Sequence, residues 1–433
     1  MRIGVPKESL PGERRVAATP KTVRALLALG HQVLVESGAG SAASYPNAGY
    51  TDVGAELADR EQVWATDLVV KINSPVPGEV ALLAPGSMIA ALLAPSTSPE
   101  LLADLAQHDV TALAMDAVPR ISRAQALDVL SSMANLAGYR AVIEAANVYG
   151  GLFTGQVTAA GKVPPAHVFV VGAGVAGLAA IGAAGSLGAE VAAFDVRPEV
   201  AEQVESLGAR FVRVEGSSAI QAEQRSDGYA GELSEDLEAA ARRVYAEQAR
   251  AADIVITTAL IPGRAAPTLI TAETVAAMKP GSVIVDLAAP AGGNVEGTVP
   301  GTQVSTSNGV TIIGWTDLAG RLPTQASQLF GTNVLNLVKL LTPDADGRLE
   351  LDLTDVVQRG MTVTRGGRVT WPPPPVKVSA GQPAEPAPSP AAVTRPPPHP
   401  IRRGVGFALA AVIFALVATF SPAEFLGHFT VLA

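Results

Sequence analysis

The chain has 433 residues, enough for two or three domains, and its formal net charge of −9 without a long basic run argues against nucleic acid as a partner. It contains no cysteine, which excludes disulfides, cysteine-based zinc sites and thiol catalysis, and we predict no metal site. Charged residues make up only 16 % of the sequence and the mean hydropathy is +0.29, values that direct attention to a membrane segment.

Strands and helices alternate along the first 120 residues. This alternation is typical of a parallel α/β sheet, here without a glycine-rich nucleotide motif. Ser98 is the expected N-cap of the second helix in this region. The predicted strands are residues 2–6, 31–36, 68–72, 88–93 and 110–115, the helices 22–29 and 99–107, and residues 38–50 form a loop.

A long helix from Pro119 to Ala146 is predicted to lead into a second domain. Ser122 and Gln125 have the spacing of a capping box at its start. Segments 352–363 and 368–371 are typical of edge pieces, and we expect them to return to the first domain, so that the second domain is an insertion. The predicted bounds are 1–121 plus 317–375 for the first domain and 122–316 for the second.

The second domain is centred on the stretch from His167 to Arg197. A short apolar strand is followed by Gly172, Gly174 and Gly177 in G-x-G-x-x-G spacing, and then by a helix, a second strand and Asp195. This order is the context that a dinucleotide site requires: a tight turn, a close backbone approach to the pyrophosphate, and close packing of the helix. The acidic residue would accept hydrogen bonds from ribose hydroxyls and repel a 2′-phosphate, which favours NAD(H) over NADP(H).

The rest of the second domain continues the sheet. A polar stretch, residues 215–236, is long for a loop in a compact sheet and predicts a mobile flap. Helices are expected at residues 235–252 and, beyond the domain, at 326–341. The predicted strands are 168–171, 191–194, 211–214, 254–258, 283–287 and 310–313.

The C-terminal part differs in composition from the rest. Residues 376–400 are rich in proline, alanine and serine and predict an extended linker. Residues 404–420 carry no charge, and a buried core helix is the alternative to a transmembrane helix; we favour the membrane because no core adjoins the linker. Arg402 and Arg403 would keep the globular part in the cytoplasm, at the inner membrane. Residues 421–433 look like the start of a second, truncated membrane segment.

Five stretches carry a family resemblance: GVPKES…ERRVAATP, PRISRAQALDVLSSMANLAGYRAV, VVGAGVAGLAAIGAAGSLGAEVAAFDVR, ITTALIPG and MKPGSVIVDLA. Together they resemble the NAD(H)-binding alpha subunit of proton-translocating NAD(P) transhydrogenases, over roughly residues 1–372. The resemblance implies a homodimeric component that binds NAD(H), with NADP(H) on a partner subunit that spans the membrane. Hydride would pass directly between the two nicotinamides, coupled to proton movement.

The resemblance also implies roles for a turn that matches Arg120 to Ser131. Arg120 would pair with Asp128, Gln125 would reach the ribose and the hydride-transfer site, and Ser131 would support the nicotinamide amide. Tyr229 would close over the adenine side with the flap. These side chains would position the cofactor without acid/base chemistry. The alternatives are helix capping for Gln125 and an ordinary surface pair for Arg120 and Asp128. For Tyr229 the alternative is an incidental tyrosine in a loop. The predicted contacts are Arg120, Gln125, Asp128, Ser131, Gly172, Ala173, Gly174, Val175, Gly177, Asp195, Val196, Arg197, Gly228, Tyr229, Ala259 and Leu260.

Alanine dehydrogenases are similar in fold and in the N-terminal stretches. Arg15 and Lys71 lie where that family holds its amino-acid substrate, but the stretch ALLAPSTSPELL lacks the histidine that the family needs there. Because oxidation of an amine carbon needs a proton acceptor, transhydrogenation is favoured and both cations are interpreted as structural. A membrane-tethered amino-acid dehydrogenase and an NAD sensor are the alternatives. Pro290 replaces an acidic residue frequent in the family, so its loop is assigned no contact with the cofactor. Separately, the proton path is assigned to the partner subunit.

Overall fold

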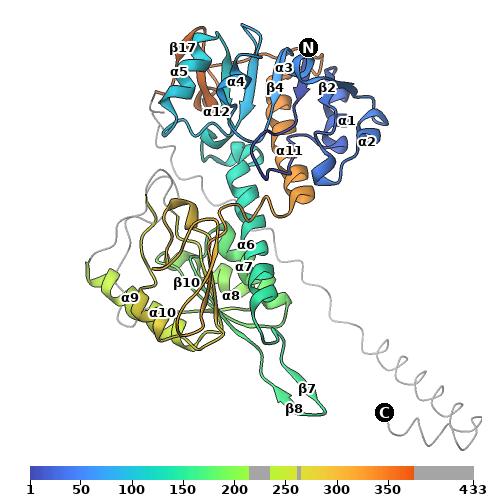
Figure 1. The fold of residues 1–433 in the computed structure, drawn as a ribbon. Coiled ribbons are helices and arrows are strands. Elements are labelled where there is room, and N and C mark those ends of the chain that lie inside the picture. The colour runs from blue at the N-terminus through green and yellow to red at the C-terminus, as the bar shows by residue number, and fades with distance from the viewer. Residues whose placement is uncertain (214–234, 261–264, 375–433) are drawn as a thin grey trace, which may run out of the picture. The chain divides into compact units, whose positions relative to one another are not determined.

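A computed structural model describes residues 1–213, 235–260 and 265–374 of the chain. The chain divides into two units, Met1–Pro374 and Pro375–Ala433, and the second lies outside the described residues. The first unit contains two large, mainly parallel sheets with their helices and one small hairpin (Figure 1). The predicted α/β class is therefore confirmed.

The first sheet consists of β1 (Arg2–Val5), β2 (Gln32–Glu36), β3 (Glu56–Ala58), β4 (Leu68–Val70), β5 (Met88–Ala91), β6 (Thr111–Ala114), β16 (Thr362–Arg365) and β17 (Arg368–Val369). Its order is β17-β16-β6-β5-β4-β1-β2-β3, and the strands from β6 to β3 are parallel. Strand β16 pairs antiparallel with β6, so the chain returns to the first sheet after building the second, as expected. Strand β3, only three residues long, was not expected from the sequence.

The helices that accompany this sheet are α1 (Pro20–Ala28), α2 (Asn47–Thr51), α3 (Arg60–Trp64), α4 (Pro77–Val80), α5 (Pro99–Gln107), α11 (Pro323–Leu341) and α12 (Val356–Met361). The prediction of a loop over residues 38–50 is wrong, because a 3₁₀ turn, η1 (Ser41–Ala43), and the start of α2 lie there. The buried Tyr50 explains the helix, since its hydroxyl donates a 2.8 Å hydrogen bond to the carbonyl of Ala18 in the core. Ser98 precedes α5 as predicted, although its side chain makes no cap hydrogen bond.

The second sheet consists of β9 (His167–Val171), β10 (Glu190–Phe194), β11 (Arg210–Phe211), β12 (Ile254–Thr257), β13 (Val283–Asp286), β14 (Gln303–Ser305) and β15 (Thr311–Ile313). Its order is β11-β10-β9-β12-β13-β15-β14, and only β14 runs antiparallel to its neighbour. The central strands β12 and β13 are buried along their whole length, as continuous apolar runs in a parallel sheet predict. Its helices are α7 (Val175–Ser186), α8 (Ala201–Ser206), α9 (Glu235–Ala251) and α10 (Ala272–Ala276).

One long helix, α6 (Val129–Val148), connects the first sheet to the second, but it starts later than predicted. The expected capping box of Ser122 and Gln125 is wrong, because both residues lie in a separate 3₁₀ turn, η3 (Ser122–Leu127). The N-cap is Asp128, whose Oδ1 accepts a 2.9 Å hydrogen bond from the backbone N–H of Ser131. Helix α6 packs tightly on α7: a Cβ at Gly138 would lie 1.9 Å from the carbonyl oxygen of Ala176.

Strands β7 (Gln156–Thr158) and β8 (Gly161–Val163) form an antiparallel hairpin that the sequence analysis did not predict. Figure 1 shows it extending from the second sheet. Both strands are largely exposed, and the side chain of Val157 is 80 % exposed.

Among the described residues, no helix combines the length and apolar character needed to cross a membrane. The predicted linker, transmembrane helix and following segment, residues 376–433, all lie outside this part of the chain.

Candidate nucleotide site

The glycine-rich loop joins β9 to α7 and has the geometry that its spacing predicts. Gly172 has a φ of +96°, which an L side chain rarely adopts, so the tight turn after the strand requires glycine. A Cβ at Gly177 would lie 1.8 Å from the carbonyl oxygen of Gly172, so the helix can approach the strand only without a side chain there. The predicted roles of Gly172 and Gly177 in the fold are therefore confirmed.

Gly174 differs from these two glycines because a Cβ there would meet no atom of the described residues within 4 Å, apart from its chain neighbours. It is the N-cap of α7, and no side chain caps this end of the helix. The first backbone N–H groups of a helix have no partners within it, and the N-terminus attracts anions. The open space and the uncapped N–H groups fit a pyrophosphate, and Ala173 and Val175 flank the same turn.

The loop lies where the order of the second sheet reverses, between β9 and β12. Ligands of open α/β sheets bind at this point, beyond the carboxyl ends of the strands. Thr258, directly after β12, donates to the carbonyl oxygens of Val171 and Gly172 at 3.2 Å each, so the two strand ends are joined. The predicted contact residues Ala259 and Leu260 follow Thr258 and therefore lie beside the glycine loop.

Two residues that the sequence analysis missed hold this edge in place. The amide of Asn294 accepts from the N–H of Ala259 at 3.0 Å and donates to its carbonyl at 2.9 Å. The carboxylate of Asp286 is fully buried and accepts hydrogen bonds from Thr257, Thr298 and the backbone of residues 288, 294 and 295. The loop after β13 thus supports the strand ends beside the glycine loop, a role that Pro290 gave no reason to expect. The signal available in the sequence was an aspartate at the end of an apolar strand.

Asp195 lies just beyond β10, as predicted, but its carboxylate already has protein partners. Oδ2 accepts from the N–H of Ala173 at 2.7 Å and from Nη2 of Arg197 at 2.9 Å. Oδ1 accepts from the N–H and the Nε of Arg197 at 2.9 and 3.0 Å. A carboxylate has about four acceptor positions, so these donors fill it. The ribose contact of Asp195 stays a prediction, and it requires Arg197 to give up a hydrogen bond.

The same pair changes the argument about cofactor preference. The hydrogen bond and the charge of Asp195 raise the pKa of Arg197 despite its partial burial, so the guanidinium stays charged and balances the carboxylate. An arginine at this place in a dinucleotide fold can accommodate a 2′-phosphate. The charge of Asp195 alone therefore does not decide between NAD(H) and NADP(H).

The turn from Arg120 to Ser131 is compact and is held by Asp128. In addition to the N–H of Ser131, this carboxylate accepts the hydroxyl of Ser131 at 2.6 Å. Arg120 and Gln125 are exposed on the turn, where a ligand could reach them. The pairing of Arg120 with Asp128 stays a prediction. Because α6 starts at this turn and packs on the first turn of α7 through Gly138, one helix links the turn to the glycine loop.

The corresponding edge of the first sheet, where its order reverses between β1 and β4, carries ion pairs whose cations are buried. Lys71 is fully buried, and its Nζ lies 3.3 Å from Glu79 and 3.5 Å from Glu8. Arg15 is paired with Glu13 at 2.6 Å and with Asp317 at 2.8 Å. Both cations are thus held by the chain's own carboxylates, which agrees with the interpretation of Lys71 and Arg15 as structural charges.

The charges of this network are mutually stabilised. Burial works to raise the pKa of Glu13, but the hydrogen bonds and charge of Arg15 and a hydrogen bond from Asn73 outweigh it and lower the pKa to about 2. Burial likewise works to raise the pKa of Glu79, and the charge of Lys71 with several hydrogen bonds leaves it below its ordinary value. The carboxylates therefore stay ionised and keep their cations.

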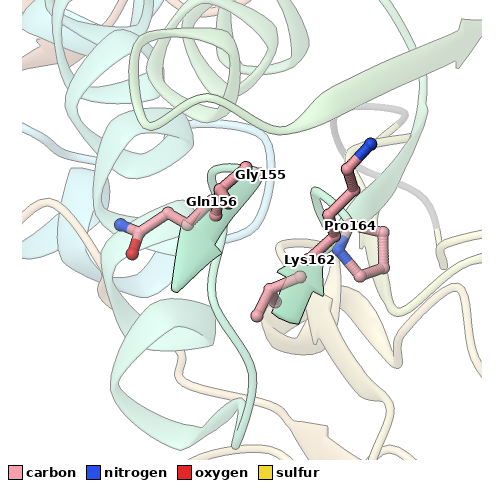
Figure 2. A pocket seen from close by; sticks show the side chains of 6 residues that line it. Gly155, Gln156, Lys162 and Pro164 are labelled. Atoms are coloured by element: carbon pink, nitrogen blue, oxygen red, sulfur yellow. The ribbon is translucent and has the colours of Figure 1, made fainter. Parts of the chain in front are cut away.

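Other candidate positions fall outside this geometry. Gly228 and Tyr229 of the predicted flap lie outside the described residues. In the described part of the chain, no group of histidine, aspartate or glutamate side chains is arranged to hold a metal ion. A shallow pocket on the β7–β8 hairpin contains none of the predicted contacts; its lining residues are Gly155, Gln156, Val157, Lys162, Val163 and Pro164 (Figure 2).

Comparison with known proteins agrees with this arrangement. The family model described as "Alanine dehydrogenase/PNT, N-terminal domain" matches residues 4–137, and "Alanine dehydrogenase/PNT, C-terminal domain" matches residues 141–372. A protein named NAD(P) transhydrogenase subunit alpha, from Haemophilus influenzae, is 52 % identical over 100 % of this chain and 84 % of its own length.

A crystal structure of transhydrogenase from Sinorhizobium meliloti matches with a TM-score of 0.77 and 40 % identity, over 85 % of this chain and 100 % of that one. The alanine dehydrogenase of Bacillus subtilis is more distant, at 35 % identity over 68 % of this chain and 72 % of its own length. Transhydrogenation is therefore favoured over the amino-acid dehydrogenase alternative. The chain belongs to the alanine dehydrogenase/PNT family and, within it, to the NAD(P) transhydrogenase alpha subunits.

Proposed function

We propose that this chain is the NAD(H)-binding component of a proton-translocating transhydrogenase, and that residues 122–316 form its NAD(H) domain. Hydride would pass directly between NAD(H) held here and NADP(H) on a partner subunit. The observation that carries the proposal is the contrast between the open glycine loop and the filled edge of the first sheet. A Cβ at Gly174 meets no described atom within 4 Å outside its chain neighbours, whereas Lys71 and Arg15, at the edge where the resemblance places the substrate of alanine dehydrogenases, are paired with the chain's own carboxylates.

The residues of the chain bind and orient. The loop from Gly172 to Val175 and the first turn of α7 would hold the pyrophosphate through backbone N–H groups. Gln125, exposed on a turn fixed by Asp128, would direct the nicotinamide end. When bound, the nicotinamide itself supplies or accepts the hydride. Since hydride transfer between two nicotinamides abstracts no proton from a substrate, positioning can supply the rate enhancement without an acid or base.

Three further elements of the proposal come from the sequence and from the resemblance. Residues 404–420 would anchor the chain in the inner membrane, with the globular part in the cytoplasm and the proton path in the partner. Gly228 and Tyr229 would close over the adenine side. Two copies of the chain would form a homodimer, which sedimentation of the purified component can test.

The test of the activity is hydride exchange after the full chain is combined with its NADP(H)-binding partner subunit. Reduction of an NADP analogue by NADH is the expected result. NADH that binds without any exchange would overturn the proposal. Pyruvate and ammonia serve as the matched alternative: oxidation of NADH by this pair would indicate an amino-acid dehydrogenase instead.

A further inference from the structure

The turn that carries Gln125 is fastened to a helix more than 200 residues later in the chain. The carbonyl oxygen of Ala126, the residue after Gln125, accepts two side-chain hydrogen bonds from α11. The Nδ2 of Asn333 donates at 2.9 Å and the Nδ2 of Asn336 at 3.0 Å. The two asparagines are three residues apart and therefore lie on the same face of the helix. One backbone carbonyl of the turn is thus held by two amides.

Helix α11 is a rigid support for these amides. Phe330 and Val334 are fully buried in the core of the first sheet. The hydroxyl of Ser327 accepts a 2.9 Å hydrogen bond from the N–H of Val16, which fixes the helix to the segment before α1. The position of the turn is therefore set by the first sheet and its core.

Asn333 is placed for this contact and not for the stability of the core. Its side chain is buried, yet its Oδ1 has no hydrogen-bond partner among the described residues. A buried acceptor without a partner destabilises the folded state, whereas a leucine of similar shape would avoid the penalty. The amide is thus explained by its donation to Ala126.

A second interaction, an ion pair, fixes the turn on the other side of Gln125. Arg123 donates from Nη1 to the Oδ2 of Asp355 at 2.8 Å. The other oxygen of Asp355, Oδ1, caps α12 by accepting the N–H groups of Val357 and Gln358. Arg123 is half exposed, so this pair contributes little energy but restricts the direction of the turn. Gln125 therefore lies between two fixed points, residues 123 and 126.

We infer that Asn333 and Asn336 are positioning residues for hydride transfer. They hold the backbone of the turn so that Gln125 presents its side chain to the nicotinamide end in a single orientation. The inference rests on the proposed role of the turn from Arg120 to Ser131. A misplacement of about 1 Å can slow a transfer between two bound reactants about a hundredfold while the cofactor stays bound.

The experiment uses the full chain with its partner subunit and the variants Asn333→Leu and Asn336→Leu. Four quantities are measured: the rate of hydride transfer from NADH to an NADP analogue, the isotope effect with NADH deuterated at C4, the Kd of NADH, and the Tm. We expect transfer to slow by about tenfold to a hundredfold and the isotope effect to rise. The Kd should stay within about threefold of the wild type, and Asn333→Leu should not lower the Tm.

Thr332→Val is the matched control, because Thr332 lies on the same helix and its hydroxyl donates to Gln328 within it. This variant should transfer hydride at the wild-type rate. Equal rates in the wild type and both asparagine variants would overturn the inference and leave the proposed function intact. A slower transfer explained by a proportionate rise in the Kd of NADH would also contradict it. A wild-type complex that binds NADH without exchange would overturn the function itself.

Discussion

In both sheets the strand order reverses beside a central strand, between β1 and β4 in the first and between β9 and β12 in the second. Such an edge is where α/β sheets bind ligands. The edge of the first sheet is occupied by long charged side chains, with Lys71 buried between Glu8 and Glu79. The edge of the second sheet is built from glycines, and among the described residues no atom outside the chain neighbours of Gly174 lies within 4 Å of a Cβ placed there.

The same topology can therefore form either a structural support or a binding site, depending on which groups the loops place at the strand ends. Side chains that pair with each other close the first edge and fix its loops. Backbone N–H groups at a helix N-terminus leave the second edge open to an anion. Substitutions at the first edge should therefore change stability without changing NADH binding, whereas substitutions at the second edge that the fold can accommodate should weaken NADH binding.

The largest expected effect lies at the closed edge. Lys71→Met removes the cation between two buried carboxylates and should lower the free energy of unfolding by about 3–5 kcal/mol. The affinity of the remaining folded protein for NADH should be unchanged. Chemical denaturation and a binding titration measure the two quantities. Lys279→Met, which breaks the more exposed pair with Asp253, is the control and should change stability by about 0–1 kcal/mol.

The second prediction concerns pH. Because the pKa of Glu13 is about 2 in the folded chain against an ordinary 4.5, its contribution is fully present above pH 4.5 and is lost as the pH falls through 2. This shift corresponds to about 3 kcal/mol. Between pH 5 and pH 2 we expect the free energy of unfolding of Glu13→Gln to fall by about 3 kcal/mol less than that of the wild type. Parallel pH profiles for the two proteins would show that Arg15 does not hold this carboxylate ionised.

A smaller effect is expected at the open edge. Asp195→Ala should weaken NADH binding by about 1–3 kcal/mol, because hydrogen bonds to a charged group are lost. Its removal also releases Arg197 from the carboxylate that it now pairs with, so the affinity for NADPH should rise relative to that for NADH. Calorimetric titration with both nucleotides checks this. An unchanged Kd for NADH in Asp195→Ala would reject the role of Asp195 in binding.

The comparison also shows what the sequence can and cannot predict. The glycine loop was predictable because its spacing stands between a strand and a helix, and each backbone requirement belongs to one local turn. The N-cap of α6 was not, since Ser122 and Gln125 fit the capping pattern as well as Asp128 does, and only the 3₁₀ turn decides between them.

Contacts between distant residues were also beyond the sequence. Nothing local in α11 indicates that Asn333 donates to Ala126, 207 positions earlier. The hydrogen bonds that Arg197 donates to Asp195 were not predicted, for a different reason. The two residues are close in sequence, but the direction of a side chain after a strand is set by its surroundings. Return of the chain to the first sheet was predictable, because short segments at 352–371 follow the last strand of the second.

The measurement that tests the central claim most directly is the affinity of Gly174→Ala for NADH, beside its Tm. A methyl group at Gly174 meets no described atom within 4 Å outside its chain neighbours, so stability should fall by no more than about 1 kcal/mol, the cost of alanine as an N-cap. NADH should bind at least about tenfold more weakly because the backbone can no longer approach the pyrophosphate. Gly177→Ala should instead destabilise the fold by about 1–3 kcal/mol, and Gly185→Ala, at an open position inside α7, should leave NADH binding unchanged and raise stability by up to about 1 kcal/mol. Wild-type affinity for NADH in a folded Gly174→Ala would contradict the account.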